Sequence, residues 1–264
     1  HWSKLVHPKK SHLMDRLFEK LYPYNAPVMV RQHQKHFGVH KKKNLISLKE
    51  QTPFNHVFDY VSQVTRLERL PCYAAQSGIS GLQAMNTVNP AVLVGQDMTR
   101  SVPMTVLAFS IAKILFLMTP HAMMSTLDTE YDARRNRLML IIFTLMKLAR
   151  IDIEQFDSGL LSIYQKIGEL DRNKMNELIL EMQQNQKTHL DVSRWLDGLD
   201  HTANRLGFLM SNDLVAAAQA IRNETIFISK SSVSDRIQEL VLFSISDDYF
   251  QLRRDLGIEI RSRG

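Results

Sequence analysis

Hydrophobic residues recur at helical spacing along most of the chain. Ser11 can cap a first helix, whose apolar stripe is Leu13, Met14, Leu17, Phe18 and Leu21. Thr52-Pro53 begins a second helix, because proline is favoured in a first helical turn. Further helices are expected at Met104–Met118, Ala122–Leu148, Ile153–Ile167, Arg172–Asn185, Leu190–Met210, Asp213–Ile221, Val233–Ser244 and Asp247–Leu256.

Residues 71–95 interrupt this helical pattern. The segment contains three glycines, and its short β-compatible pieces are Cys72–Ala75 and Ala91–Val94. Such pieces, separated by turn residues, are typical of a small sheet or hairpin. The sequence therefore predicts a mainly α fold with a small β-sheet, of the α+β class, arranged around a central apolar helix.

The longest apolar run is Val106–Met118, which Lys113 interrupts. It is too short for a membrane span, which needs about 20 apolar residues. We therefore expect no transmembrane segment and interpret the run as a buried helix. The residues expected in the core are Leu107, Ile111, Ile114 and Leu115.

Composition adds the broad class. The chain has 264 residues, of which 44% are hydrophobic and 23% are charged, as in ordinary globular proteins. The single cysteine, Cys72, excludes an internal disulfide and favours a reducing compartment, so we expect a cytoplasmic protein. Because the sequence opens at His1, a signal or further domains upstream stay open.

Charge is concentrated in the first fifth of the chain. Residues 1–50 carry nine lysines and two arginines against three acids, whereas the remainder is slightly acidic. The basic cluster comprises Arg31, Lys35, Lys41, Lys42 and Lys43. It indicates either an anion-binding surface for nucleic acid or acidic lipid, or simply a solvated helix face and loop. We therefore separate a basic lead-in, residues 1–50, from a main domain, residues 51–264.

Two tracts carry a resemblance to a known family. The first is PCYAAQSGISGLQAMNTVNPAVLVGQDM, residues 71–98, directly before the apolar helix. The second is DHTANRLG, residues 200–207. In order and spacing, these tracts resemble the HtpX and CAAX-prenyl-protease family of zinc metallopeptidases. The resemblance covers roughly Thr52–Ile258. The segment around the second tract also resembles degenerate peptidase-like domains that follow tetratricopeptide repeats in deltaproteobacterial proteins.

The resemblance implies a site that has lost its chemistry. In the family, His-Glu-x-x-His on the central helix and an acidic residue on a later helix hold zinc and activate water. Lys113 and Leu117 stand at the two His positions, and Ile114 stands at the Glu position. Asp200 stands at the third ligand and Asn204 at a following Asp. These five residues, the vestigial site, imply a pseudoenzyme with no catalytic residue, metal or cofactor.

Two interpretations of Lys113 and Asp200 stay open. The side chains form an ion pair across the former metal position, with nitrogen and oxygen within about 4 Å. Alternatively, Lys113 extends to solvent and Asp200 caps a helix locally.

The resemblance also implies a peptide-binding edge. Ala91-Val92-Leu93-Val94 resembles the strand with which a substrate backbone pairs in active relatives. Either the groove beside it is open and binds a partner segment without cutting it, or the chain fills the groove with its own side chains. We expect the filled groove, with Phe116 as the filling side chain.

These patterns together predict a non-catalytic interaction or scaffold module with protein partners, within a larger bacterial protein or assembly. One alternative is an anion-binding module that uses the basic cluster. A second alternative is a metal-dependent hydrolase with non-standard ligands.

Overall fold

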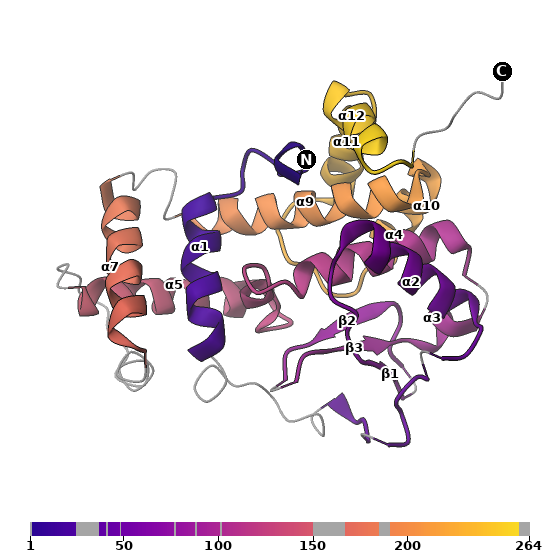
Figure 1. The fold of residues 1–264 in the computed structure, drawn as a ribbon, viewed down its shortest axis with the longest axis horizontal. Coiled ribbons are helices and arrows are strands. Elements are labelled where there is room, and N and C mark those ends of the chain that lie inside the picture. Colours follow the sequence, from indigo (N-terminus) through magenta and orange to yellow (C-terminus); the bar gives the residue numbers. More distant parts are fainter. Residues whose placement is uncertain are drawn as a thin grey trace.

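The computed structural model describes residues 2–24, 37–40, 42–47, 49–76, 78–87, 89–100, 102–149, 167–184 and 191–258. Within these ranges the protein is mostly helical with one three-stranded sheet, which confirms the predicted fold class. The longest helix, α9 (Val192–Ser211), runs across the molecule (Figure 1). The helices at one end of it are α1 (His12–Leu21), α5 (Tyr131–Leu148) and α7 (Glu169–Gln184).

The other end of α9 lies over the sheet and its covering helices (Figure 1). These helices are α2 (Pro53–Thr65), α3 (Gln96–Arg100), α4 (Met104–Leu117) and α10 (Leu214–Arg222). Beyond α9 lie α11 (Val233–Ser244) and α12 (Asp247–Asp255). Short 3₁₀ turns occupy Trp2–Lys4, Tyr22–Tyr24 and Met123–Thr126.

Helix starts follow the predicted caps. The side chains of Ser11 and Thr52 accept hydrogen bonds from Met14 N and Asn55 N, and Pro53 occupies the first turn of α2. Because these oxygens satisfy otherwise unpaired amides, each fixes where its helix begins.

One expected helix differs from the prediction. Ala122–Leu148 is broken into a 3₁₀ turn and α5, which begins at Tyr131. Between them the guanidinium of Arg134 donates to the carbonyls of Asp128 and Thr129, which holds that segment as a turn. The helix expected at Ile153–Ile167 lies almost wholly outside the described residues.

The sheet has the strand order β1-β3-β2, with β1 (Cys72–Ala74), β2 (Leu82–Met85) and β3 (Ala91–Val94). β3 pairs in parallel with β1 and antiparallel with β2. The expectation that Ala91-Val92-Leu93-Val94 forms an edge is therefore wrong. All four residues are buried, as is typical of an apolar run in a central strand. The strand that the prediction missed, β2, forms the edge beside α4.

Helix α4 lies at the centre of the main core and packs along α9. Leu107, Ile111, Ile114 and Leu115 are all buried, which confirms the prediction for them. The close approach of the two helices depends on Gly207, because a Cβ there would lie 2.7 Å from the Phe109 ring. Residues of the expected lead-in join this core as well, including Leu5, Leu13, Met14, Leu17 and Phe18.

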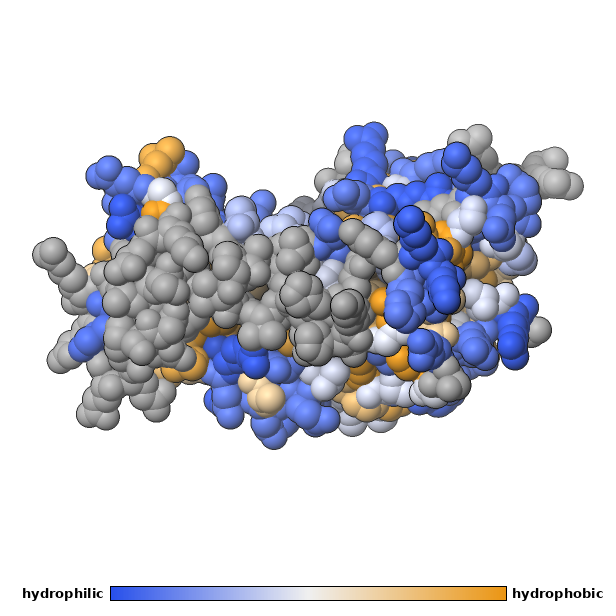
Figure 2. All heavy atoms as spheres, turned by 90° about the horizontal axis from the view of Figure 1, so that it is seen from below, coloured by the Kyte–Doolittle hydropathy of each residue, from blue (hydrophilic) through white to orange (hydrophobic). Residues whose placement is uncertain are grey.

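One face of the molecule shows how polar and apolar side chains are distributed on the described surface. In the view from below, hydrophilic side chains spread over the described part of the face, and apolar ones form small separate patches (Figure 2). Among the described residues, no helix combines the length and apolar character that crossing a bilayer requires.

Candidate functional site

Four charged side chains meet between α4, α9 and α11 and form what we call the ion-pair quartet: Lys113, Asp200, Glu224 and Arg236. Lys113 Nζ lies 3.0 Å from Asp200 Oδ1 and 2.6 Å from Glu224 Oε1. Arg236 Nε lies 3.0 Å from Asp200 Oδ2, and its Nη1 lies 3.0 Å from Glu224 Oε2. Each acid therefore contacts both cations, and the formal charge of the quartet is zero.

Separate parts of the chain supply the quartet. Lys113 is on α4 and Asp200 is on α9, the two helices that Gly207 allows to approach closely. Glu224 follows the end of α10, and Arg236 lies in the first turns of α11 after a Ser232 capping box. The quartet therefore ties the central helix to three C-terminal segments that are distant from it in sequence.

Three members of the quartet lie inside the protein, and the side chain of the fourth, Glu224, is 18% exposed. Lys113 is 8% exposed, Asp200 0% and Arg236 1%, so these charges have lost their water. Neutral groups complete the bonding: Ser229 Oγ donates to Asp200 Oδ2, and Arg236 Nε donates to the Ser231 carbonyl. A buried charge without such partners costs several kcal/mol, so the completeness of the quartet is what makes its burial tolerable.

The pKa values of the two acids diverge. Burial pushes the pKa of Asp200 upward, but Lys113, Arg236 and the Ser229 hydroxyl hold it below its usual value. Burial, with the nearby charge of Asp200, keeps the pKa of Glu224 above its usual value although Lys113 and Arg236 lower it. Such a split is expected when two carboxylates share the same partners. Burial lowers the pKa of Lys113, but Asp200 and Glu224 raise it by more, so the pKa lies above its usual value. The Lys113 side chain is therefore an ammonium at neutral pH.

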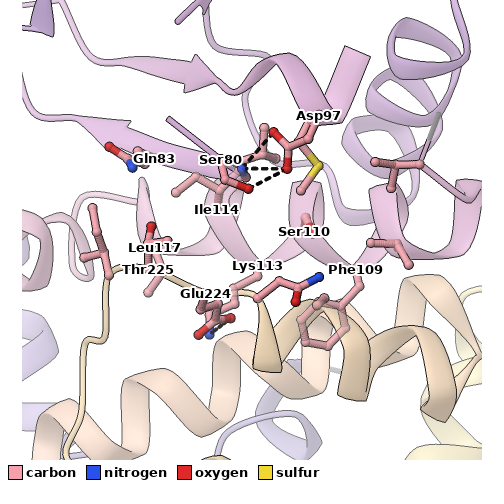
Figure 3. A pocket seen from close by; sticks show the side chains of 18 of the residues that line it. Ser80, Gln83, Asp97, Phe109, Ser110, Lys113, Ile114, Leu117, Glu224 and Thr225 are labelled. Atoms are coloured by element: carbon pink, nitrogen blue, oxygen red, sulfur yellow. Dashed lines mark hydrogen bonds and ion pairs between the residues drawn. The ribbon is translucent and has the colours of Figure 1, made fainter. Parts of the chain in front are cut away.

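A cleft of about 200 Å³ opens beside the quartet (Figure 3). Its walls are β2, α4 and the segment after α10, and Lys113 and Glu224 lie at its floor. The side chains of α4 that line it include Phe109, Ser110, Ile114 and Leu117. A second hollow of about 150 Å³ continues along β2, since it shares Gln83, Ala84, Thr126, Ile226 and Ile228 with the first.

The strand β2, whose residues Leu82, Gln83 and Ala84 line this cleft, is the outer strand of the sheet. Gly95 N donates to Gly81 O, so residues 83 and 85 direct their amides and carbonyls at β3, whereas the amide of Gly81 donates to the Asp97 carboxylate. The backbone groups of Leu82 and Ala84 then point to the outer edge. The register on β3 agrees with this. Val92, which lies opposite Ala84, donates its amide to the Pro71 carbonyl, on the side of β3 away from β2. Among the described residues no further strand pairs with β2.

The structure brings part of the vestigial site together. The Lys113–Asp200 ion pair is present, and the alternative in which Lys113 extends to solvent is wrong. Ile114 and Leu117 line the cleft. Asn204 is fully buried, and its side-chain oxygen and nitrogen have no hydrogen-bond partner in the described part of the chain.

Other predicted features lie apart from the cleft. Phe116 is buried in an edge-to-face contact with His121 and does not line the cleft. The expectation that Phe116 fills the groove is therefore wrong. In the basic cluster, Lys42 and Lys43 are exposed. The other three members, Arg31, Lys35 and Lys41, lie outside the described residues.

Sequence reasoning missed Glu224 and Arg236. Arg236 occupies a core-facing position of α11, in line with buried Leu240 and Phe243, so its helical spacing was an available signal. Glu224 lies in a loop, where no periodicity marks a buried acid.

The donor set defines what this arrangement can do. Both carboxylates are held by cations, and the neighbouring positions on α4 are the apolar Ile114 and Leu117. Within the described ranges, no three His, Cys, Asp or Glu side chains are grouped as metal ligands. The site is therefore a cleft between the β2 edge and the ion-pair quartet, whose charges are paired with one another and sum to zero. No family model, curated protein or solved structure matches this chain.

Proposed function

We propose that this chain is a non-catalytic protein-interaction module, built like a zinc metallopeptidase, in which the ion-pair quartet stands at the metal position. The observation that carries the proposal is the 3.0 Å contact between Lys113 and Asp200, which the resemblance places at the first and third ligand positions. The quartet links α4 to α9, as a metal bound by both helices would. Hydrolysis additionally needs a general base, and Ile114 at that position cannot act as one.

The cleft supports an extended segment of a partner protein as the ligand. The edge of β2 offers the amide and carbonyl of Leu82 and of Ala84, which match the backbone of an added strand. Pockets for small-molecule ligands usually hold about 300–1,000 Å³. The two hollows along β2, about 200 and 150 Å³, are smaller and fit single side chains of a bound segment.

Restoring the lost ligands tests the metallopeptidase geometry. In the variant Lys113→His/Ile114→Glu/Leu117→His, two imidazoles lie one helical turn apart on the side of α4 that contacts Asp200. We expect this variant to bind one Co²⁺ with the visible absorption of a tetrahedral site, and the unmodified chain to bind none tightly. The single variant Lys113→His is the control. Tight cobalt binding by the unmodified chain, or cleavage of peptides by it, would contradict the proposal.

Proline substitutions on β2 test the binding mode. A ligand can be selected from displayed random ten-residue peptides, and its affinity measured by fluorescence anisotropy. Ala84→Pro removes an amide at the outer edge of β2 and leaves the β2–β3 ladder intact, so affinity should fall about tenfold at unchanged stability. In the matched control, Gln83→Pro, the lost amide faces β3, so stability should fall instead. Equal affinity for the unmodified chain and Ala84→Pro refutes strand addition.

A further inference from the structure

The N-terminal segment, residues 2–10, lies as a strap across α9 beside α11 and α12 (Figure 1). It crosses α9 at Gly198, where a Cβ would lie 2.4 Å from Lys10 N and 2.6 Å from Lys10 Cα. Only glycine allows the backbone of the strap to approach so closely. The absence of a side chain at Gly198 therefore creates the docking position of the strap on α9, which we call its seat.

Individual contacts attach the strap to this seat. His7 N donates to Thr202 Oγ1 at 3.0 Å, and Lys9 Nζ lies 3.4 Å from Asp197 Oδ2. Arg205 Nη1 donates to the Leu5 carbonyl at 3.4 Å. These polar contacts are individually weak, and the burial of Leu5 in the main core adds to them, so docking of the strap depends on all of them together.

Two histidines meet at the centre of the docked strap. The ring centroids of His7 and His201 are 4.6 Å apart, and His201 is buried. Lys9 N donates to His7 Nδ1 at 3.2 Å, so this nitrogen is an acceptor and carries no proton. His201 Nδ1 is buried without a hydrogen-bond partner in the described part of the chain. A protonated imidazole donates from both nitrogens, so adding a proton to His7 destroys the Lys9 bond.

The charged surroundings disfavour protonation of either ring. Burial, the adjacent His201, and then Arg205, Lys9 and Arg194 lower the pKa of His7 to about 3. Burial also lowers the pKa of His201 below its usual value. The charged groups that face the pair are Lys9 on the strap, Arg194, Asp197, Asp200 and Arg205 on α9, and Asp235 and Glu239 on α11.

Glu239 is the nearest acid to His7, yet it does little to compensate. Its Oε1 lies 4.0 Å from His7 Nε2 but only 2.6 Å from Arg205 Nη2, which already neutralises it. Burial raises the pKa of Glu239 as well.

We propose that the strap is a pH-sensitive latch, which stays docked on α9 while His7 and His201 are neutral and releases when they gain protons. The direction follows from linkage, since docking depresses the pKa of His7 below its ordinary value of 6.5. Docking is at full strength above pH 6.5. It weakens by up to about tenfold for each pH unit below that value.

A nitroxide label on the strap measures the release. Ser3 is exposed and accepts the label as Ser3→Cys. The native Cys72 is fully buried, and burial raises the pKa of its thiol to about 12, so it does not compete. We expect an immobile electron-paramagnetic-resonance spectrum at pH 7.5 and a growing mobile component down to pH 5.0. Helical circular dichroism should stay constant, which separates release from global unfolding.

Variants assign the response to the two rings. His7→Gln/His201→Gln retains amide hydrogen bonding but cannot titrate in this range, so its strap should show one mobility at all these pH values. His12→Gln, at an exposed position of α1, is the matched control and should respond like the parent. If the double variant does not fold, His7→Gln alone should reduce the response. A strap of constant mobility in the parent, or a response that survives in the His variants and disappears in Glu239→Gln, overturns the latch.

Discussion

Replacing Lys113 with Met tests how the ion-pair quartet contributes to stability. Methionine has a similar length, so the change removes the charge and leaves little cavity. Asp200 and Glu224 then share Arg236 as the remaining cation of the quartet, in a site where Asp200 is 0% exposed. Removing one partner of a buried ion pair typically costs about 3–5 kcal/mol, because the remaining charge is uncompensated. We expect a loss in this range in urea unfolding at pH 7.5, followed by circular dichroism.

The double variant Lys113→Met/Glu224→Gln separates charge from packing. It restores neutrality, since Asp200 still pairs with Arg236 and the amide at position 224 can still accept from Arg236 Nη1. We expect it to recover a coupling energy of about 0.5–3 kcal/mol relative to the sum of the single variants. The reasoning is refuted if Lys113→Met costs less than about 1 kcal/mol, or if the double variant is less stable than Lys113→Met.

Acid should partly rescue Lys113→Met. A carboxyl group whose pKa is raised by folding, as for Glu224, destabilises the fold when it is ionised, so its cost declines as pH falls toward its usual pKa of 4.5. The stability difference between Lys113→Met and the parent should therefore shrink from pH 7.5 to pH 5.5. A difference that is constant over this range would show that Glu224 does not carry the cost.

Three further predictions concern the same core. Leu115→Ala should cost about 2–5 kcal/mol in urea unfolding, and a near-neutral effect would place α4 outside the core. Gly207→Ala should cost about 1–3 kcal/mol of stability because its Cβ would lie 2.7 Å from Phe109. Its control is Gly168→Ala, which has open space around it and should cost little. Equal effects of the two substitutions would contradict the close approach of α4 and α9. Asp200 has a lowered pKa, so its contribution is present above its usual value of 3.8 and lost as pH falls below it. Asp200→Asn should therefore flatten the acid limb of the stability profile, and an unchanged limb would exclude Asp200 as its source.

The sheet shows where pattern reasoning succeeds and where it stops. The apolar run Ala91–Val94 identified a strand, but its neighbours are set by pairing between distant segments, which composition does not encode. The mixed sequence Leu82–Met85 gave no strand signal of its own, yet it forms the edge beside the cleft.

The sequence by itself determined most of the helices and the central place of α4. Caps and runs of apolar residues are local features of the sequence, so Ser11, Thr52 and the apolar run of α4 are visible without any tertiary information. The Lys113–Asp200 pair was one of the two interpretations that the resemblance to a known family left open, and the structure contains it. Only the tertiary structure added Glu224 and Arg236 to that pair and placed His7 on His201, because charges separated by many residues meet only when helices pack. Local sequence fixes which elements form, and packing decides which side chains share a site.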